Sequence, residues 1–147
     1  MKIIVTGALG HIGSYIIRSL GVKFEGAEII MIDNMMTQRF PSLFNLPKTG
    51  NYKFLDKDVT KMDLSAVFNG ADVVVHLAAI TDAAGSFERA EELENNNYNS
   101  TKNLIDCINH FNSKIHFIFA SSSNIFLKKK INKYKKSDIF YENDSYS

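Results

Sequence analysis

The sequence is poor in cysteine, in proline and in net charge. Cys107 is the one cysteine among 147 residues, which excludes an internal disulfide and suits a reducing compartment. Seventeen basic and 16 acidic residues leave a formal net charge of +1, so no global field attracts nucleic acid or an anionic membrane. No apolar run approaches the roughly 20 residues that span a bilayer. These absences predict a soluble cytoplasmic protein without a membrane partner.

The sequence contains strand and helix patterns that alternate along a chain long enough for one globular domain. Hydrophobic residues make up 45% of the chain and charged residues 22%, enough to build a core. Short apolar runs predict buried strands at 2–7, 28–34, 52–59, 71–79 and 114–123. Helical patterns lie between them at 11–20, 63–69 and about 86–110, the first ended by Gly21. Strands that alternate with helices predict an α/β fold with a parallel sheet and βαβ crossovers.

Three glycines lie between the first strand and the first helix, in the stretch TGALGHIG. Gly7 permits a tight turn, Gly10 leaves room for a pyrophosphate, and Gly13 lets the helix pack close to the strand. The helix N-terminus then offers N–H groups and a positive dipole end to an anion.

Asp33 completes the pattern at the end of the second strand, 20 residues after Gly13. Its carboxylate suits the hydroxyls of an adenosine ribose and repels a 2′-phosphate, which favours NAD over NADP. A glycine turn beside an incidental surface aspartate is the alternative.

The chain resembles the extended short-chain dehydrogenase/reductases, and within them the NAD-dependent nucleotide-sugar epimerase/dehydratase family. The matching motifs follow in order over nearly all of residues 1–127. They are TGALGHIG, MIDNMMT, KDVT, HLAA, NNYNSTKNLI and FIFASSSNIF. Ser100 stands where the family usually has glycine, and Phe126 where it has tyrosine.

The resemblance implies a Rossmann-type parallel sheet of order 3-2-1-4-5 with helices on both faces. Residues 1–127 would form an NAD-binding domain that is incomplete relative to the family, truncated after about the fifth strand. Residues 128–147 would be a basic loop and tail, and a substrate domain is not expected within this sequence.

The resemblance also assigns cofactor-binding roles by position. One set forms the pyrophosphate loop and the ribose contacts: Gly7, Ala8, Leu9, Gly10, His11, Ile12, Gly13, Asp33 and Asn34. A second set holds adenine or passes beneath the cofactor: Asp58, Val59, Leu77, Ala78, Ala79, Asn97 and Ser121. No metal ligand is expected, because the four histidines show no metal-site spacing.

The catalytic residues implied by the resemblance are Ser122 and Tyr146. Ser122 stands at the family's catalytic Ser or Thr, and Tyr146 follows it by 24 residues, where the family has its YxxxK tyrosine. The lysine would be position 150, and Tyr134 and Tyr141 have no lysine four residues on. Whether the chain is itself an enzyme is therefore open, and we expect negligible activity from these residues alone.

The parent reaction implied is reversible hydride transfer at a hydroxyl of a nucleotide sugar. Sugar 4,6-dehydratases resemble a pattern with Asp-Glu after the catalytic Thr, whereas Ser123 and Asn124 occupy those places. This difference favours a 4-epimerase, close to UDP-glucose 4-epimerases, over a dehydratase.

Two other interpretations of the chain remain open on the sequence. Cofactor binding without catalysis would make it a non-catalytic NAD-binding or sensor protein. Six lysines within residues 128–136 could contact nucleic acid, although a solvated charge run is the usual explanation. A sheet that ends at its fifth strand would also expose an edge, which predicts self-association.

Overall fold

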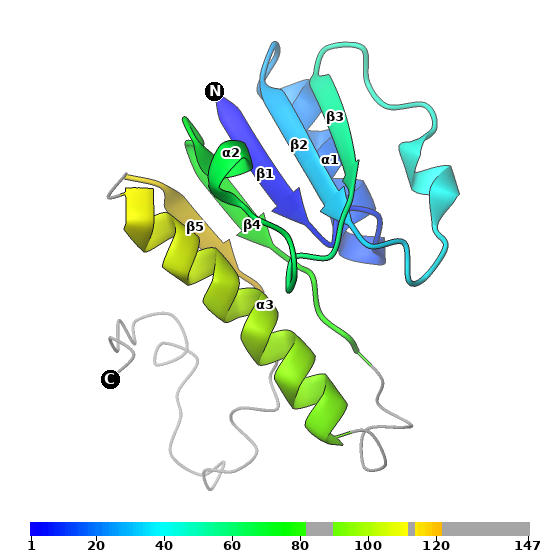
Figure 1. Ribbon diagram of the computed structural model, residues 1–147. Helices are drawn as coiled ribbons and strands as arrows, with labels where there is room; N and C mark the ends of the chain where they lie inside the picture. Colours follow the sequence, from blue (N-terminus) through cyan, green and yellow to red (C-terminus); the bar gives the residue numbers. More distant parts are fainter. Residues whose placement is uncertain (82–89, 112–113, 122–147) are drawn as a thin grey trace, which may run out of the picture.

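The computed structural model describes residues 1–81, 90–111 and 114–121 of the chain. Within them, five parallel strands form one sheet in the order β3-β2-β1-β4-β5 (Figure 1). The strands are β1 (Lys2–Thr6), β2 (Glu28–Asp33), β3 (Asn51–Asp56), β4 (Val73–His76) and β5 (His116–Phe119). The predicted parallel sheet and its strand order are confirmed.

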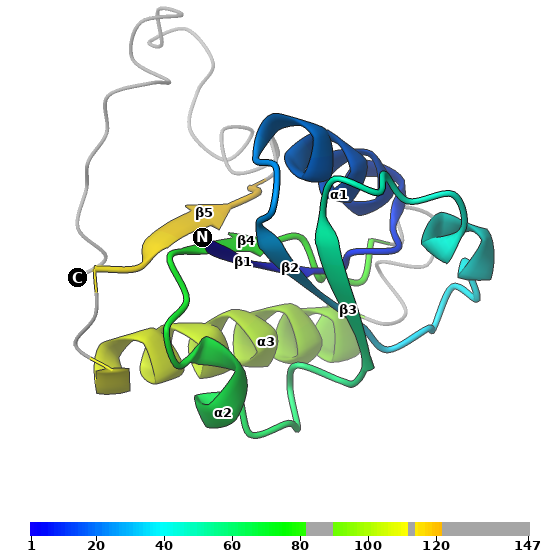
Figure 2. The same cartoon turned by 90° about the horizontal axis from the view of Figure 1, so that it is seen from above.

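Helices cover both faces of this sheet. α1 (His11–Lys23) lies on one face, while α2 (Ser65–Phe68) and α3 (Ala90–Phe111) lie on the other (Figure 2). A short 3-10 helix, η1 (Phe40–Leu43), follows β2. No helix in the described ranges is both long and apolar enough to cross a membrane.

The core has two layers because each central strand buries both of its faces. The layer on the α1 side contains Ile3, Val5, Ile29, Met31, Val75 and Ile17. The layer beneath α2 and α3 contains Ile4, Ile30, Ile32, Val74, Phe68 and Leu104. Successive residues of a strand point to opposite faces, so a continuous apolar run supplies both layers at once.

The prediction that α1 ends at Gly21 is wrong, because the helix continues to Lys23. A side chain at Gly21 would collide with the hydroxyl of Tyr52, which donates a hydrogen bond to the carbonyl of Ile17 at 3.1 Å. Gly21 thus makes room for a ring from β3 inside the helix. Sequence spacing could not distinguish this packing role from a helix stop.

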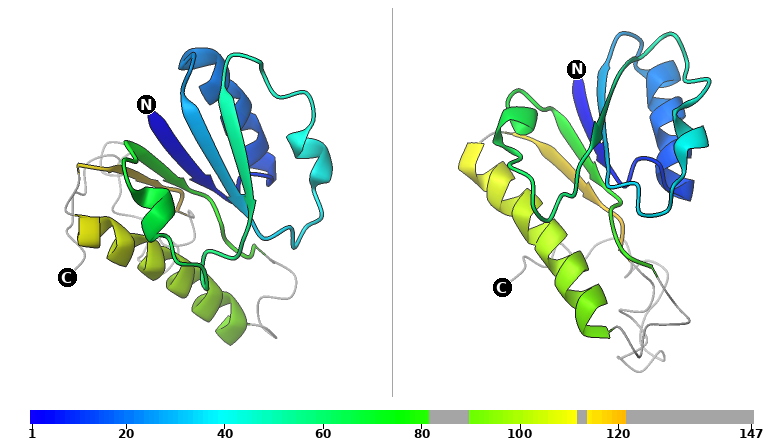
Figure 3. Two further views of the ribbon diagram at one scale, coloured as in Figure 1. Left: turned by 45° about the horizontal axis from the view of Figure 1, so that its top comes forward. Right: turned by 45° about the vertical axis from the view of Figure 1, so that its right-hand side comes forward.

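The long helix α3 lies alongside β4 and β5 in both orientations of Figure 3. The outer strand is partly exposed on both faces: Ile118 of β5, on the α1 side, is 53% exposed, and Phe119, which lies beside His76 on the α3 side, is 43% exposed. The expectation of self-association through this edge stays a prediction.

A buried histidine joins β1, β4 and α3. His76 is 2% exposed, its Nδ1 lies 2.7 Å from Thr6 Oγ1, and its Nε2 lies 3.1 Å from Thr101 Oγ1. Thr101 donates its own proton to the carbonyl of Asn97, so it accepts from Nε2–H, and Nδ1 accepts from Thr6. Both ring nitrogens are satisfied only while the ring is neutral. Burial lowers the pKa of His76 to about 4.

Because His76 is buried in its neutral form, we expect the free energy of unfolding to fall in acid. Its pKa is about 4 in the folded chain and about 6.5 when unfolded, so the unfolded state binds the proton first as pH falls. Stability is full above pH 6.5, and we expect about 3 kcal/mol to be lost between pH 7 and pH 4 from this group. Urea unfolding at both pH values measures the change.

The matched control for this measurement is His76→Gln, whose amide does not titrate. Its free energy of unfolding should depend less on pH than that of the unsubstituted chain, whatever its value at pH 7. An identical pH dependence in the two proteins would contradict the assignment of acid sensitivity to His76.

Candidate nucleotide-binding site

The predicted binding residues gather at the edge of the sheet where the parallel strands end. The glycine loop follows β1, Asp33 ends β2, Asp58 comes after β3, and Leu77 follows β4. In open α/β sheets, ligands bind in the crevice outside the carboxyl ends of the strands. The strand order therefore brings together residues that lie up to 70 positions apart.

The glycine loop is held by close backbone contacts. Gly7 has φ of +64°, and a Cβ there would lie 2.7 Å from the nitrogen of Ala78 and from the carbonyl of Leu77. A Cβ at Gly13 would run into the Gly7 carbonyl and lie 2.8 Å from the carbonyl of Ala8. The fold itself therefore requires glycine at both positions.

The same loop is less crowded at Gly10 than at Gly7 or Gly13. A Cβ there would meet only the Gly7 carbonyl, at 3.3 Å. Gly10 is the N-cap of α1, and no side chain caps the helix. His11 and Ile12, in the first turn, are exposed. A helix N-terminus without a side-chain cap fits an anion such as a phosphate.

Ala8 and Leu9 contribute their backbone, because their side chains are buried in the core. The N–H of Ala8 donates to the carbonyl of Ile32 at 3.3 Å, and that of Leu9 donates to Asp33 Oδ2 at 3.0 Å. The loop is thus tied to the end of β2 on one side and abuts the end of β4 on the other.

Asp33 is half-buried and held at both carboxylate oxygens. Oδ2 accepts from Leu9, and Oδ1 accepts from the N–H of Met35 at 3.0 Å. An ionised carboxylate has about four acceptor sites, so a ribose hydroxyl can still bind. Asn34 is exposed, and its Oδ1 accepts from the N–H of Met36 at 3.1 Å.

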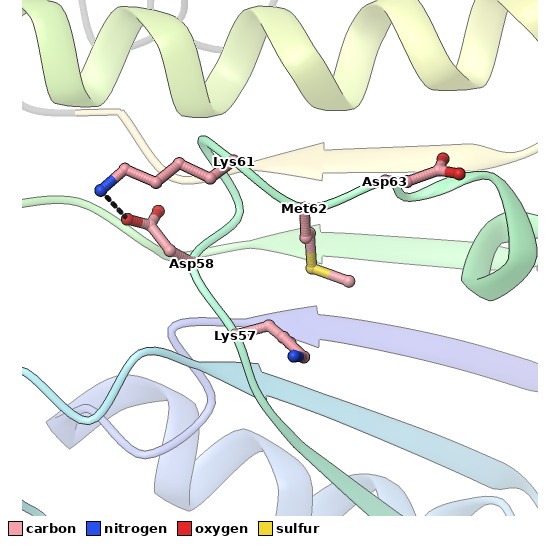
Figure 4. A pocket seen from close by; sticks show the side chains of 5 residues that line it. All are labelled: Lys57, Asp58, Lys61, Met62 and Asp63. Carbon is pink, nitrogen blue, oxygen red and sulfur yellow. Dashed lines mark ion pairs between the residues drawn. The ribbon is translucent and has the colours of Figure 1, made fainter.

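An open pocket of about 410 Å³ lies beyond β3, lined by Lys57, Asp58, Lys61, Met62 and Asp63 (Figure 4). Burial alone would raise the pKa of Asp58, but hydrogen bonds from Thr60 and the charge of Lys61, 3.7 Å away, outweigh it and lower the pKa. Asp58 is therefore an ionised acceptor at neutral pH. The neighbouring Val59 is 6% exposed and packs in the core.

The segment after β4 is held from two sides. The N–H groups of Leu77 and Ala78 each donate to Thr6 Oγ1 at 3.3 Å. The side-chain amide of Asn97 accepts from the N–H of Ile80 at 2.8 Å and donates to its carbonyl at 3.2 Å. Asn97 thus fixes a backbone segment at the edge, and its direct contact with a cofactor stays a prediction. Ala79 is exposed within this segment.

The predicted catalytic residues are not placed with this set. Ser121 is exposed just after β5, but Ser122 and Tyr146 lie outside the described residues, as does the lysine cluster at 128–136. The structure therefore assembles the predicted binding residues and leaves the predicted catalytic pair untested.

One YxxxK match escaped the sequence reasoning because it lies before the fifth strand. Tyr98 and Lys102 of α3 have this spacing. Tyr98 is 63% exposed, and the Lys102 ammonium is paired with the Asp106 carboxylate. Residue spacing without the family's position in the fold does not identify a catalytic pair.

Three further residues support the edge and were missed from sequence. Thr6 and Thr101 bond His76, while Asn103 Nδ2 donates to the carbonyls of Val59 at 2.6 Å and Met62 at 3.3 Å. The available signals were a hydroxyl ending an apolar strand, and polar residues recurring three and four positions apart along a helix. Neither signal identifies the distant group that each side chain contacts.

Solved structures of nucleotide-sugar enzymes share this fold. A UDP-N-acetylglucosamine 4-epimerase from Methanobrevibacter ruminantium superposes with a TM-score of 0.78 at 29% identity, over 92% of this chain and 42% of that one. A UDP-glucuronic acid 4-epimerase from Bacillus cereus, solved with UDP-glucuronic acid and NAD, gives 0.76 at 31% identity, over 86% and 41%.

Sequence relatives include both epimerases and dehydratases. A UDP-glucose epimerase named YtcB from Bacillus subtilis, itself uncharacterized, is 29% identical over 88% of this chain and 42% of its own length. A dTDP-D-glucose 4,6-dehydratase from Dictyostelium discoideum is 30% identical over 85% of this chain and 30% of its own. The chain thus spans at most about two fifths of the length of these two relatives.

The model of the NAD dependent epimerase/dehydratase family matches residues 3–147, nearly the whole chain. This match agrees with the strand order, the glycine loop and the acidic residue that ends β2. The chain belongs to the NAD dependent epimerase/dehydratase family.

Proposed function

We propose that this chain is the NAD(H)-binding portion of a nucleotide-sugar epimerase. The observation that carries the proposal is the glycine loop, where backbone contacts require Gly7 and Gly13 and where Gly10 begins a helix that no side chain caps. A helix that no side chain caps leaves its first N–H groups without intrahelical partners, where an anion can bind. The residues present therefore fit a dinucleotide.

The pyrophosphate, the adenosine ribose and the adenine each have a candidate partner. The N–H groups at the start of α1 would bind the pyrophosphate. Asp33 would accept from the ribose hydroxyls, and its negative charge favours NAD over NADP. Asp58 would accept from the amino group of adenine, beside the backbone of Val59. The residues from Leu77 to Ala79 would lie beneath the rest of the cofactor.

Bound NAD would supply the hydride acceptor for oxidation of a sugar hydroxyl. Ser122 would hydrogen-bond the oxygen that loses its proton, and Tyr146 would take that proton. Ser123 and Asn124 stand where 4,6-dehydratases have an acid pair, which supports a 4-epimerase reaction. The Methanobrevibacter and Bacillus cereus enzymes named above, both 4-epimerases of UDP-sugars, support the same choice.

Calorimetric titration tests the cofactor assignment. We expect saturable binding of NAD and weaker binding of NADP, because Asp33 repels a 2′-phosphate. Asp33→Asn keeps the size of the side chain and removes its charge, and should weaken NAD binding by about tenfold or more while narrowing the difference from NADP. Asp106→Ala, which removes a charge from the exposed surface of α3, is the control and should bind like the unsubstituted chain.

A folded protein that does not bind NAD would contradict the proposal. Equal affinities in Asp33→Asn and the unsubstituted chain would remove Asp33 from the site.

Turnover is the second test. The 147-residue polypeptide should bind NAD without interconverting UDP-glucose and its C4 epimer, because the lysine that the family places four residues after its tyrosine would be position 150. Chromatography of the nucleotide sugars after prolonged incubation measures the conversion. Sustained NAD-dependent turnover would show that Tyr146 needs no lysine.

A further inference from the structure

The turn that carries Asp58 receives part of its support from a distant helix. Within the turn, Asp58 Oδ1 accepts from the N–H of Thr60 at 2.9 Å and from its hydroxyl at 2.7 Å, and the Asp58 carbonyl accepts from the N–H groups of Lys61 and Met62. These bonds shape the turn internally. They do not determine where it lies relative to the sheet.

Besides the hydrogen bond from the N–H of Lys57 to the carbonyl of Asp33 at 3.0 Å, two sets of contacts anchor the turn to the rest of the molecule. The side chains of Val59 and Leu64 are buried in the core beneath α2 and α3. Asn103, on α3, donates one side-chain amide to two carbonyls of the turn, at 2.6 Å to Val59 and 3.3 Å to Met62. Asn103 is half-buried, and nothing in its sequence neighbourhood links it to residues more than 40 positions earlier.

The anchored carbonyls lie just after the candidate adenine contact, Asp58, in the same turn. Val59 directly follows Asp58, and Met62 lines the same pocket as Asp58 (Figure 4). A displacement of the turn would move the Asp58 carboxylate relative to the glycine loop and Asp33, which are held by β1 and β2. Because hydrogen bonding to a ligand depends on distance and angle, such a displacement weakens one end of a bound dinucleotide selectively.

We propose that Asn103 is a positioning residue for the adenine end of the cofactor, setting the affinity for adenine through the Val59 and Met62 carbonyls. The proposal rests on the proposed function, since it assumes that NAD binds with adenine at Asp58. Asn103 does not touch the cofactor. Its effect is confined to ligands whose base carries an amino group at position 6 that can donate to Asp58.

The experiment compares two dinucleotides that differ at position 6 of the base. NAD carries the 6-amino group of adenine, which can donate to a carboxylate. Nicotinamide hypoxanthine dinucleotide carries a 6-oxo group there, which can only accept, and has its N–H at N1 instead. Calorimetry gives the affinity of the folded 147-residue chain for each. The unsubstituted chain should prefer NAD, and Asp58→Asn should reduce that preference.

Asn103→Ala removes both anchoring bonds and raises intrinsic helix propensity. Asn99→Ala, at an exposed position one turn earlier on α3, makes the same chemical change without touching the turn and is the matched control. We expect Asn103→Ala to weaken NAD binding about tenfold and hypoxanthine dinucleotide binding by less than about threefold. Asn99→Ala should change neither affinity. Asn103→Asp, which keeps the size but removes the donors, replaces Asn103→Ala if a thermal melt shows that the latter is unfolded.

The outcomes separate the two proposals. If Asp58→Asn weakens NAD binding but Asn103→Ala does not, or if Asn103→Ala weakens both dinucleotides equally, the positioning role is overturned and the adenine site stands. If Asp58→Asn leaves NAD binding unchanged, the adenine assignment fails and the role of Asn103 falls with it. Absence of NAD binding to the folded unsubstituted chain would overturn the proposed function itself.

Discussion

The backbone at Gly7 lies against the backbone of Leu77 and Ala78, with no room for a side chain between them. This contact joins the ends of β1 and β4 and forces the chain to turn with a positive φ. This turn places the start of α1 at the edge of the sheet. Because Gly13 has no side chain, the helix can pack close to the loop. The candidate anion-binding loop is thus held in place by close backbone packing.

The helix α3 provides the second constraint. Its polar side chains reach three separate parts of the chain: Asn97 holds the backbone after β4, Thr101 bonds the ring of His76, and Asn103 holds the turn after β3. An apolar face alone would pack α3 on the sheet but would leave its rotation and sliding loosely specified. Directed hydrogen bonds to these segments define both, and so define the loops that line the edge.

The described residues explain why relatives with different reactions share this half of the fold. Epimerases and dehydratases both occur among proteins similar to this chain. Residues that hold the adenosine end of a dinucleotide are remote from the bond that reacts, so they carry little information about which sugar is used or which step comes after its oxidation. The discrimination must come from groups near the nicotinamide and from the part of the relatives that this chain does not span.

The sequence by itself determined the element order, the parallel sheet, the glycine loop and the acid at the end of β2, because these depend on local periodicity and on residues a few positions apart. The sequence did not reveal the packing role of Gly21, which makes room for Tyr52 and does not end α1. The partners of Thr6, His76 and Asn103 likewise came only from the tertiary structure. A polar side chain indicates that it needs a partner, but strand order and helix rotation decide which distant group supplies it.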